Sequence, residues 1–285
     1  MSPRPPLERP LTARPRRDGS GEIPVAPTAA ELAGIESGTL RLVELAGATR
    51  EDDPRLGATL LVWPGRGPAF NHVARLRWTP ADWRERADAA ARRLSAIGEV
   101  PVIDVAEGLA APFDIVERLR GSGWTEVGGE MTLWTRRPAP VPHLELDLRL
   151  EAVTDRRVDE YEAVERAIFG VMPSERDDRR AALRANLASG LLRAYLVRVG
   201  GEPVATARLL VEEGLAAVHG LGVVEGRRRQ GLGRYLTTIV TRAGLAVGAS
   251  LVWLAVDPAN VPALTMYDGL DYRPAFRQRR LIGPA

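Results

Sequence analysis

A stretch rich in glycine and arginine has the residue types that a phosphate site needs. Residues 218–236 read Val-His-Gly-Leu-Gly-Val-Val-Glu-Gly-Arg-Arg-Arg-Gln-Gly-Leu-Gly-Arg-Tyr-Leu. Apolar spacing from Leu232 onward predicts a helix that follows a strand and a polar loop. Unpaired N–H groups at a helix start, together with the helix dipole, favour a bound phosphate. Two glycines would let the backbone approach the anion, and three arginines would add positive charge. These residues are Gly231, Gly233, Arg228, Arg229 and Arg234. An ordinary strand-to-helix turn in an arginine-rich protein remains the alternative.

Two other phosphate-binding motifs can be compared with the same stretch. A P-loop ends in Gly-Lys-Ser/Thr, but all 39 basic residues of this chain are arginine, which excludes that motif. A dinucleotide fingerprint needs a third small residue where Leu236 stands. Asp257, after the next apolar run, could still imitate the ribose-binding acid of that motif, so a dinucleotide site stays open.

The run Arg228-Arg229-Gln230-Gly231-Leu232-Gly233 resembles the Arg/Gln-x-x-Gly-x-Gly/Ala signature of the GCN5-related N-acetyltransferases, the GNAT superfamily. The resemblance implies that this run, with Arg234, holds the pyrophosphate of acetyl-CoA. It also implies that the preceding strand pairs with the pantetheine arm, and that a backbone N–H there meets the thioester oxygen. The residues concerned are Leu221, Gly222 and Val223. Gly220 and Gly222 fit a bulge or a close backbone approach, or else they let a neighbouring helix pack.

A second motif lies after the strand expected at 251–256. The family has Asn-x-x-Ala-x-x-x-Tyr-x-x-x-Gly-Phe, and the corresponding residues here begin at Asn260 and include Tyr267, Asp271 and Tyr272. The resemblance implies that Asn260 contacts the cofactor and that Tyr267 is the general acid for the CoA sulfur. A helical tyrosine is otherwise a core residue with its hydroxyl at the edge. Asp271 departs from the family glycine, which puts the shape of this turn in question.

The general base is less directly indicated. The family often has a glutamate on the strand before the loop, where this chain has Ala217. His219 is two residues on and on the same strand face, and its reference pKa near 6.5 would let it accept a proton from an ammonium. The alternative is a core histidine. Glu225 replaces the usual proline, and its carboxylate would be unfavourable near a phosphate unless Arg227 or Arg228 paired with it.

Composition limits the other possibilities. The chain has 285 residues, 45% of them apolar, which is enough for one large or two ordinary domains. The net charge is only +2, so nucleic acid is not an expected partner. Cysteine is absent and the three histidines are widely spread, so no metal site is expected. We found no membrane-length apolar run and no signal peptide, and we expect a cytoplasmic, bacterial protein.

Local patterns predict alternating strands and helices in both halves of the chain. In the first half we expect strands at 57–63 and 70–78, a helix at 81–97 with Thr79 as its cap, a strand at 102–105, a helix at 112–119 and a strand at 124–135. In the second we expect strands at 144–152, 191–199, 204–211, 251–256 and a pair at 272–282, with helices at 159–169, 174–187, 233–247 and 261–268.

The order of elements in the second half is the GNAT order, and the two halves resemble each other. Sliding one onto the other sets His72 beside His219 and the helix at 81–97 beside that at 233–247. The resemblance therefore implies an α/β fold with a mixed sheet and two GNAT-like domains in tandem, distantly similar to mycothiol synthase. The first domain is degenerate, because no Gly-x-Gly precedes its helix. The expected boundaries are a disordered leader 1–25, a degenerate domain 26–136, a proline-rich linker 137–143 and a GNAT domain 144–285.

These observations together predict an acetyl-CoA-dependent N-acetyltransferase in which an amine attacks directly within a ternary complex. A non-catalytic acyl-CoA-binding or protein-interaction module is the alternative. Acetyl-CoA is expected as co-substrate, with no metal. The acceptor, a small-molecule or peptide amine, stays open because its pocket would be formed by residues 168–189 and by part of the first domain. Oligomeric state is also left open by the sequence.

Overall fold

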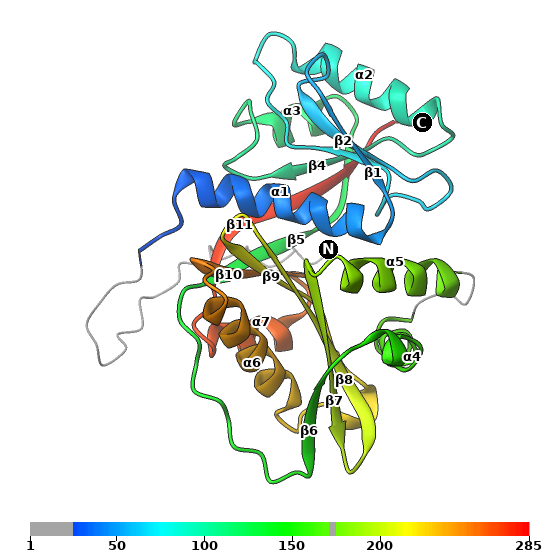
Figure 1. The fold of residues 1–285 in the computed structure, drawn as a ribbon. Helices are drawn as coiled ribbons and strands as arrows, with labels where there is room; N and C mark the ends of the chain where they lie inside the picture. Colours follow the sequence, from blue (N-terminus) through cyan, green and yellow to red (C-terminus); the bar gives the residue numbers. More distant parts are fainter. Residues whose placement is uncertain (1–24, 171–174, 285) are drawn as a thin grey trace, which may run out of the picture.

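An eleven-stranded mixed sheet runs through the described part of the chain (Figure 1). The structure is a computed structural model that describes residues 25–170 and 175–284. The strand order is β1-β2-β3-β4-β11-β5-β10-β9-β8-β7-β6. The strands are β1 (Thr49–Asp53), β2 (Ala58–Val62), β3 (His72–Ala74), β4 (Val102–Ala106), β5 (Thr125–Thr135), β6 (Leu148–Ala152), β7 (Leu192–Val199), β8 (Glu202–Glu212), β9 (Leu215–Val223), β10 (Leu251–Val256) and β11 (Arg273–Ile282). The predicted mixed α/β fold is confirmed.

Helices cover both faces of this sheet. They are α1 (Ala29–Ala46), α2 (Trp83–Ser95), α3 (Ile115–Gly121), α4 (Val158–Phe169), α5 (Arg176–Ala188), α6 (Leu232–Ala246) and α7 (Val261–Asp268), with short 3-10 turns at Asp155–Arg157 and Glu225–Arg227. Helices α1, α4 and α5 pack on one face around Ile35, Tyr161 and Trp253. Helices α2, α3, α6 and α7 pack on the other face in two clusters. No helix of the described residues is long and apolar enough to cross a membrane.

The two halves repeat one order of elements. The series α1-β1-β2-β3-α2-β4-α3-β5 is followed by α5-β7-β8-β9-α6-β10-α7-β11, and β6 and α4 precede the second series. Each half thus carries a strand, a turn and a helix (β3 to α2, and β9 to α6) in the same place. Among the described residues, the second half carries an additional strand and helix at its start, and the first half does not.

The last strand of each half is exchanged between the halves. Strand β11 lies between β4 and β5, while β5 lies between β11 and β10. All three pairings are antiparallel. Residues 272–282 were expected to form a strand pair within the second half. That prediction was wrong, because they form the single strand β11, whose partners both belong to the first half of the chain.

The two histidines that the sequence comparison set side by side are not equivalent. His72 is the first residue of β3, just before Val73, which pairs with Ile103 of β4. His219 lies two residues beyond Ala217, the last residue of β9 that pairs with β10. One histidine therefore precedes the parallel pairing and the other follows it, and the predicted match between them was wrong.

Candidate active site

The turn from β9 to α6 leaves a row of backbone donors unpaired. Arg229 and Gly231 both adopt left-handed conformations, with φ of 63° and 82°, and α6 begins at Leu232. The first helical N–H that finds an acceptor is that of Tyr235, which bonds to the Gly231 carbonyl at 2.9 Å. In the part of the chain that the structure describes, the N–H groups of residues 229–234 have no acceptor. No acidic residue lies in the first turn of α6. This arrangement suits an anion such as a phosphate.

Both glycines of the motif have a structural reason to be glycine. At Gly231 the left-handed backbone disfavours any side chain, and a Cβ there would lie 2.7 Å from Leu144 Cδ2. At Gly233 a Cβ would lie 3.3 Å from Met266 Sδ, because α7 packs closely on the start of α6. Without side chains at these two positions, Leu144 and Met266 can pack closely on the start of α6, and the backbone there stays accessible.

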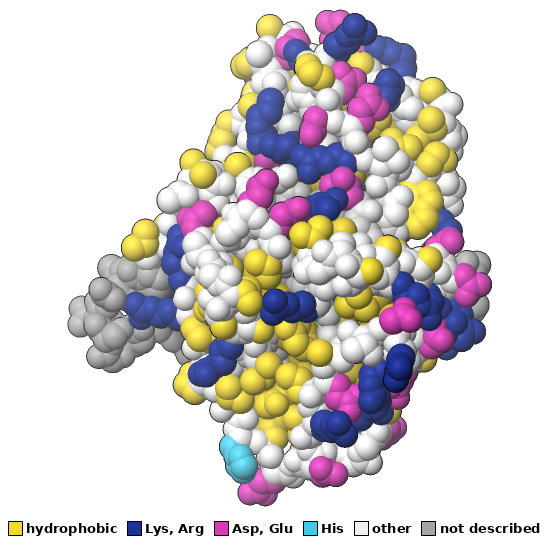
Figure 2. Space-filling model, in the orientation of Figure 1, with side chains coloured by type: hydrophobic (Ala, Val, Ile, Leu, Met, Phe, Trp, Pro, Cys, Tyr) yellow, Lys and Arg dark blue, Asp and Glu magenta, His cyan; other side chains and the backbone are white. Residues whose placement is uncertain are grey.

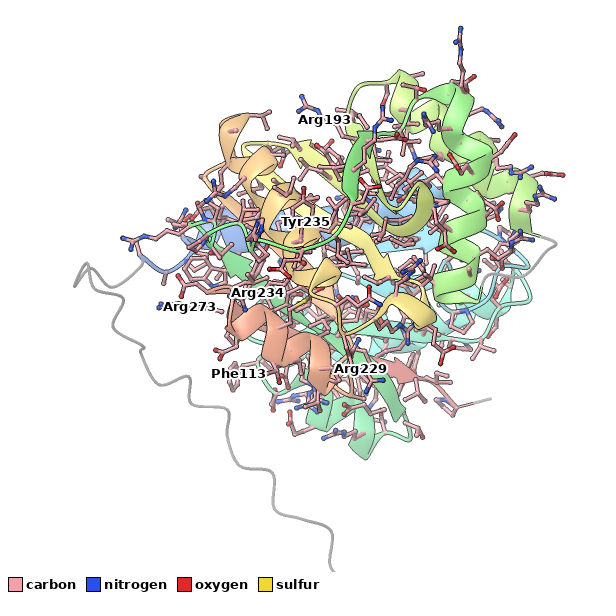
Figure 3. The ribbon with its side chains drawn as sticks, turned by 90° about the horizontal axis from the view of Figure 1, so that it is seen from below. Phe113, Arg193, Arg229, Arg234, Tyr235 and Arg273 are labelled. Carbon is pink, nitrogen blue, oxygen red and sulfur yellow. The ribbon has the colours of Figure 1, made fainter. Side chains whose placement is uncertain are left out.

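The arginines of this loop differ in how firmly they are held. Arg228 donates from Nε to the Val223 carbonyl (3.1 Å), and Arg234 donates to the Gly269 carbonyl (3.0 Å), which joins α6 to the end of α7. Arg229 is exposed and makes no hydrogen bond or ion pair with the described residues. Figure 3 labels Arg229 and Arg234 on the side of the molecule that carries α6 and α7. Arg229 is thus the most available cation for a ligand.

Glu225 has no arginine partner in this loop. Arg227 pairs instead with Glu202 at 2.7 Å, and Arg228 is occupied by the Val223 carbonyl. The Glu225 side chain is exposed, and water can screen its charge. Neither Arg227 nor Arg228 therefore pairs with Glu225. Solvent exposure of the Glu225 carboxylate is instead what limits its repulsion of a nearby phosphate.

Strand β9 parts from β10 just before this loop. The parallel pairing covers only Leu215 to Ala217 of β9, although β9 continues to Val223 and β10 to Val256. Gly220 has φ of 57° and lies in a bulge, because Arg208 and Thr206 of β8 face His219 and Gly222. Residues 221–223 are therefore without a strand on the β10 side, as an extended ligand arm would need. Gly222 also has a packing reason: a Cβ there would lie 2.3 Å from Ile168 Cγ2 of α4.

Tyr267 places an unpaired hydroxyl on α7. Its side chain is 7% exposed and packs on Tyr272, with ring centroids 5.7 Å apart. The Tyr272 hydroxyl bonds to Thr241 at 2.7 Å, whereas that of Tyr267 has no partner among the described residues. Burial raises the pKa of Tyr267 to about 12, so the phenol is protonated near neutral pH. A protonated, unpaired phenol can donate to a leaving group.

The residues around Tyr267 explain the departures in its motif. Asn260 caps α7 by accepting a hydrogen bond from the Ala263 N–H at 3.2 Å. Asp271, at the position of the family glycine, has φ of 63°, and its carboxylate pairs with Arg273 at 3.1 Å. Aspartate tolerates the left-handed region better than most residues. The turn therefore keeps its shape without glycine, and Tyr272 N–H still bonds to the Tyr267 carbonyl at 3.0 Å.

Comparisons with known proteins agree with this geometry. Residues 151–272 match the model of the acetyltransferase (GNAT) family. Residues 151–272 are a GNAT domain. No curated protein matches the chain.

Solved structures similar to the chain extend over both halves. A GCN5-related N-acetyltransferase from Kribbella flavida shares 20% identity at a TM-score of 0.68, covering 89% of this chain and 96% of that one. A GCN5-related N-acetyltransferase from Sphaerobacter thermophilus shares 17% identity at 0.58, covering 90% and 93%. A tandem GNAT protein from the clavulanic acid biosynthesis pathway shares 17% at 0.58, covering 80% and 79%. These likenesses show that the fold is shared, while the similarity to mycothiol synthase and the domain boundaries stay predictions.

His219 of the GNAT domain lies on the opposite sheet face from Tyr267. Tyr267 packs in the cluster of α6 and α7, whereas His219 lines a cavity beneath α5. Burial, and secondarily the charge of Arg208, lowers the pKa of His219 to about 3. Its Nε2 is buried and has no hydrogen-bond partner. The imidazole is therefore neutral at physiological pH. Its basicity is too low for it to act as an ordinary general base.

A buried polar group beside His219 was not predicted from the sequence. Glu165 of α4 accepts hydrogen bonds from Arg208 of β8 and from the Tyr161 hydroxyl, the latter at 3.2 Å, and Arg208 Nε donates to Tyr161 at 3.2 Å. Burial alone would lower the pKa of Arg208, but Tyr161 and Glu165 raise it. Tyr161 and Glu165 are one helical turn apart, yet nothing in the sequence pointed to Arg208 as their common partner. Arg208, next to His219, therefore stays protonated and pairs with Glu165, a carboxylate that Arg179 also approaches at 3.6 Å.

The cavity floored by His219 and Arg208 has a volume of about 180 Å³. Its walls come from α5 and β7 of the GNAT domain and from α1 and the loop after β2 in the first half. The structure thus brings His219 together with the predicted acceptor segment and the first half, but on a different face from Tyr267. Among the described residues, no cluster of His, Asp or Glu could hold a metal ion. Figure 2 shows acidic and basic side chains interspersed over the viewed face.

Proposed function

We propose that the protein transfers an acetyl group from acetyl-CoA to an amine by direct attack in a ternary complex. One observation carries this proposal: the unpaired N–H groups of residues 229–234 directly follow the part of β9 that has left β10. A diphosphate would accept from those N–H groups, and Arg229 would add charge. The free edge of residues 221–223 would pair with the pantetheine arm, and one of its N–H groups would stabilise the developing oxyanion.

The chemistry then depends on few side chains. Acetyl-CoA supplies an acyl group that is activated as a thioester. The amine nitrogen forms a bond to the acyl carbon while the carbon–sulfur bond breaks. Tyr267 would donate its proton to the sulfur, and the surplus proton of the amine would restore the phenol through water. Neutral His219 would accept a hydrogen bond from the amine N–H and orient the lone pair, which makes it a positioning residue.

Thiol release from acetyl-CoA in the presence of a panel of amines tests the proposal. Tyr267→Phe should lower kcat roughly a hundredfold, within the range for a lost general acid, and leave CoA affinity unchanged in calorimetry. Tyr272→Phe is the matched control, because that hydroxyl is bound to Thr241. CoA binding without turnover of any amine would instead favour the non-catalytic acyl-CoA-binding or protein-interaction module.

The pH dependence separates the roles of the two side chains. The pKa of His219 near 3 and that of Tyr267 near 12 keep both groups in one protonation state between about pH 5 and 10. The only proton whose loss should affect the rate in this pH range is then the proton of the acceptor ammonium. We expect kcat/KM to rise tenfold per pH unit up to the pKa of each acceptor. A common inflection near pH 6.5 for acceptors of different pKa would contradict this assignment and restore His219 as a base.

A further inference from the structure

The cavity beside His219 has an aromatic wall that belongs to the first half of the chain. Trp63 and Phe70 line it from the loop after β2, with ring centroids 5.2 Å apart and planes at 78°. Leu42 and Leu45 of α1 continue the apolar surface. On the opposite side, α5 contributes Ala182 and other residues of the GNAT domain. The acceptor side of this site is therefore shared by both halves.

This aromatic wall is held in place by buried contacts. Asn71 is fully buried, accepts from the Trp63 N–H at 2.7 Å and donates to the Trp63 carbonyl at 2.8 Å. The Trp63 ring lies against Gly47, where a Cβ would be 2.6 Å from it. Arg66 stacks over Trp63 at 4.7 Å and pairs with Asp178 of α5. The loop is thus anchored to its own half and to the GNAT domain, and its rings form a preorganised surface.

The polar groups of the cavity favour an amine with an apolar body. At the floor, Arg208 and Arg179 both pair with the Glu165 carboxylate, the latter at 3.6 Å, and His219 is neutral. At the wall, Glu175 makes no hydrogen bond or ion pair with any described residue, so its carboxylate is available to an ammonium. The volume of about 180 Å³ is below the roughly 300–1,000 Å³ of pockets for drug-sized ligands. A polycation or a folded protein surface does not fit these features.

We propose that the acceptor is a small primary amine that carries one aromatic ring on a short alkyl arm, an arylalkylamine. This inference rests on the proposed function. The ring lies on Trp63 and Phe70, Glu175 attracts the ammonium on entry, and the nitrogen reaches His219. The first half of the chain is then the determinant of acceptor specificity, although it holds no cofactor.

Acceptor kinetics with phenethylamine and with hexylamine test this inference. Trp63→Leu and Phe70→Leu keep an apolar side chain, although a smaller one, and remove a ring, and each should raise the KM for phenethylamine about fivefold to tenfold, the size of an aromatic contact. The KM values for acetyl-CoA and hexylamine should stay unchanged. Trp63→Phe should restore most of the affinity. Phe113→Leu is the matched control, because Phe113 is 89% exposed and lies outside the cavity (Figure 3).

Calorimetry in the presence of CoA keeps this inference separate from the proposed function. Binding of phenethylamine that is weakened by Trp63→Leu, without acetyl transfer, would refute the enzyme and leave the aromatic site standing. Turnover of hexylamine or of a lysine peptide with a kcat/KM equal to that of phenethylamine would refute the aromatic site and leave the enzyme standing. An unchanged phenethylamine KM in Trp63→Leu, or no binding of phenethylamine at all, would also overturn it.

Discussion

The two halves of the molecule build the same strand, turn and helix, but they treat the start of the helix in opposite ways. At α2, Asp82 accepts a hydrogen bond from the Thr79 N–H at 2.6 Å, the Thr79 hydroxyl accepts from Asp82 N–H at 3.2 Å, and Glu85 lies in the first turn. At α6 the N–H groups of residues 229–234 have no acceptor in the described chain, and the first turn has no acid. In the first half, side chains of the turn before α2 thus bond N–H groups of that turn, whereas in the second half no side chain does so.

The buried polar groups of the two halves differ in where they lie. In the first half, Asp104 of β4 is 2% exposed, is bound by Arg280 at 2.6 and 2.7 Å, and accepts from Gln278 at 3.0 Å. Burial lowers the pKa of the neighbouring His72, although Asp104 opposes this shift. Here the polar residues join β4 to β11. In the second half, His219 Nε2 and the Tyr267 hydroxyl are unpaired among the described residues. The first half also has unpaired buried atoms, among them His72 Nδ1 and Thr132 Oγ1, so the two halves differ in where such atoms lie and not in whether they occur.

Separating the halves is the strongest test of whether they are independent units. Residues 25–142 alone lack β11 between β4 and β5, and residues 143–285 alone lack β5 beside β10. Each fragment would expose a central strand, so we expect neither to unfold cooperatively in calorimetry. Coexpression should restore one transition and CoA binding. Cleavage at a protease site inserted between Val141 and Pro142 should leave the fold intact, whereas a cooperative transition in either fragment would contradict the exchange.

Placing a carboxylate at the second helix start should make it resemble the first. Gly231→Asp adds a negative charge beside the free N–H groups and strains a left-handed backbone. We expect the Kd for CoA to rise at least about a hundredfold, roughly 2.7 kcal/mol, in calorimetry. Gly98→Asp is the control in the first half, with φ of 79° and open space around it. It should lower Tm by less, because Gly231→Asp also brings a Cβ to 2.7 Å from Leu144 Cδ2, and it should leave CoA affinity unchanged. Equal losses of CoA affinity would show that backbone strain alone is responsible.

The local pattern predicted the helix starts but not the partners of the strands. The spacing from Leu232 and the glycines before it were enough to place α6 and the loop before it, whereas the anion site there stays a prediction. The alternation of side chains along β11 is the same whichever strands lie beside it. The sequence of residues 272–282 therefore does not indicate that β11 pairs with strands of the first half. The helix expected at 81–97 begins instead at Trp83, because Thr79 and Asp82 bond each other across the turn. Side-chain bonds within a turn are hard to distinguish from a helix cap by residue type.

For the candidate site, sequence motifs identified those residues whose proposed roles depend on the local backbone of one segment. The loop, Asn260 and Tyr267 were recognisable because their spacing within one segment is short. Glu165 and Arg208 meet only after α4 packs on β8, and the aromatic wall needs the loop after β2 to reach α5. The low pKa of His219 follows from burial. The position of His219 in an apolar strand indicated that it would be buried, but not how far burial would lower the basicity of the imidazole.

Breaking the polar link between β4 and β11 should affect stability and not cofactor binding. Asp104→Ala leaves Arg280 without its partner between two strands, and we expect a loss of about 2 to 3 kcal/mol in urea unfolding, since Arg280 is partly exposed. CoA affinity should be unchanged under conditions where the variant is folded. Asp114→Ala, which removes an exposed pair with Arg118, is the control and should show no measurable change. A loss of CoA affinity in Asp104→Ala would make the first half part of the cofactor site.

The smallest effect is expected from Asp82→Asn, which neutralises the internal anion of α2. The Thr79 N–H lowers the pKa of Asp82 from its ordinary 3.8, so this charge stabilises the fold above that pH, and the gain disappears as the pH falls through the lowered value. The Tm of the variant should therefore lie slightly below that of the natural chain at pH 7, and the two should converge as the pH falls below the lowered pKa of Asp82. CoA should still fail to bind at α2, because residues with side chains, at positions 82 and 84, stand where the second half has Gly231 and Gly233 relative to the helix start. If Asp82→Asn bound a second CoA at α2, the Asp82 carboxylate alone would account for the difference in CoA binding between the two halves.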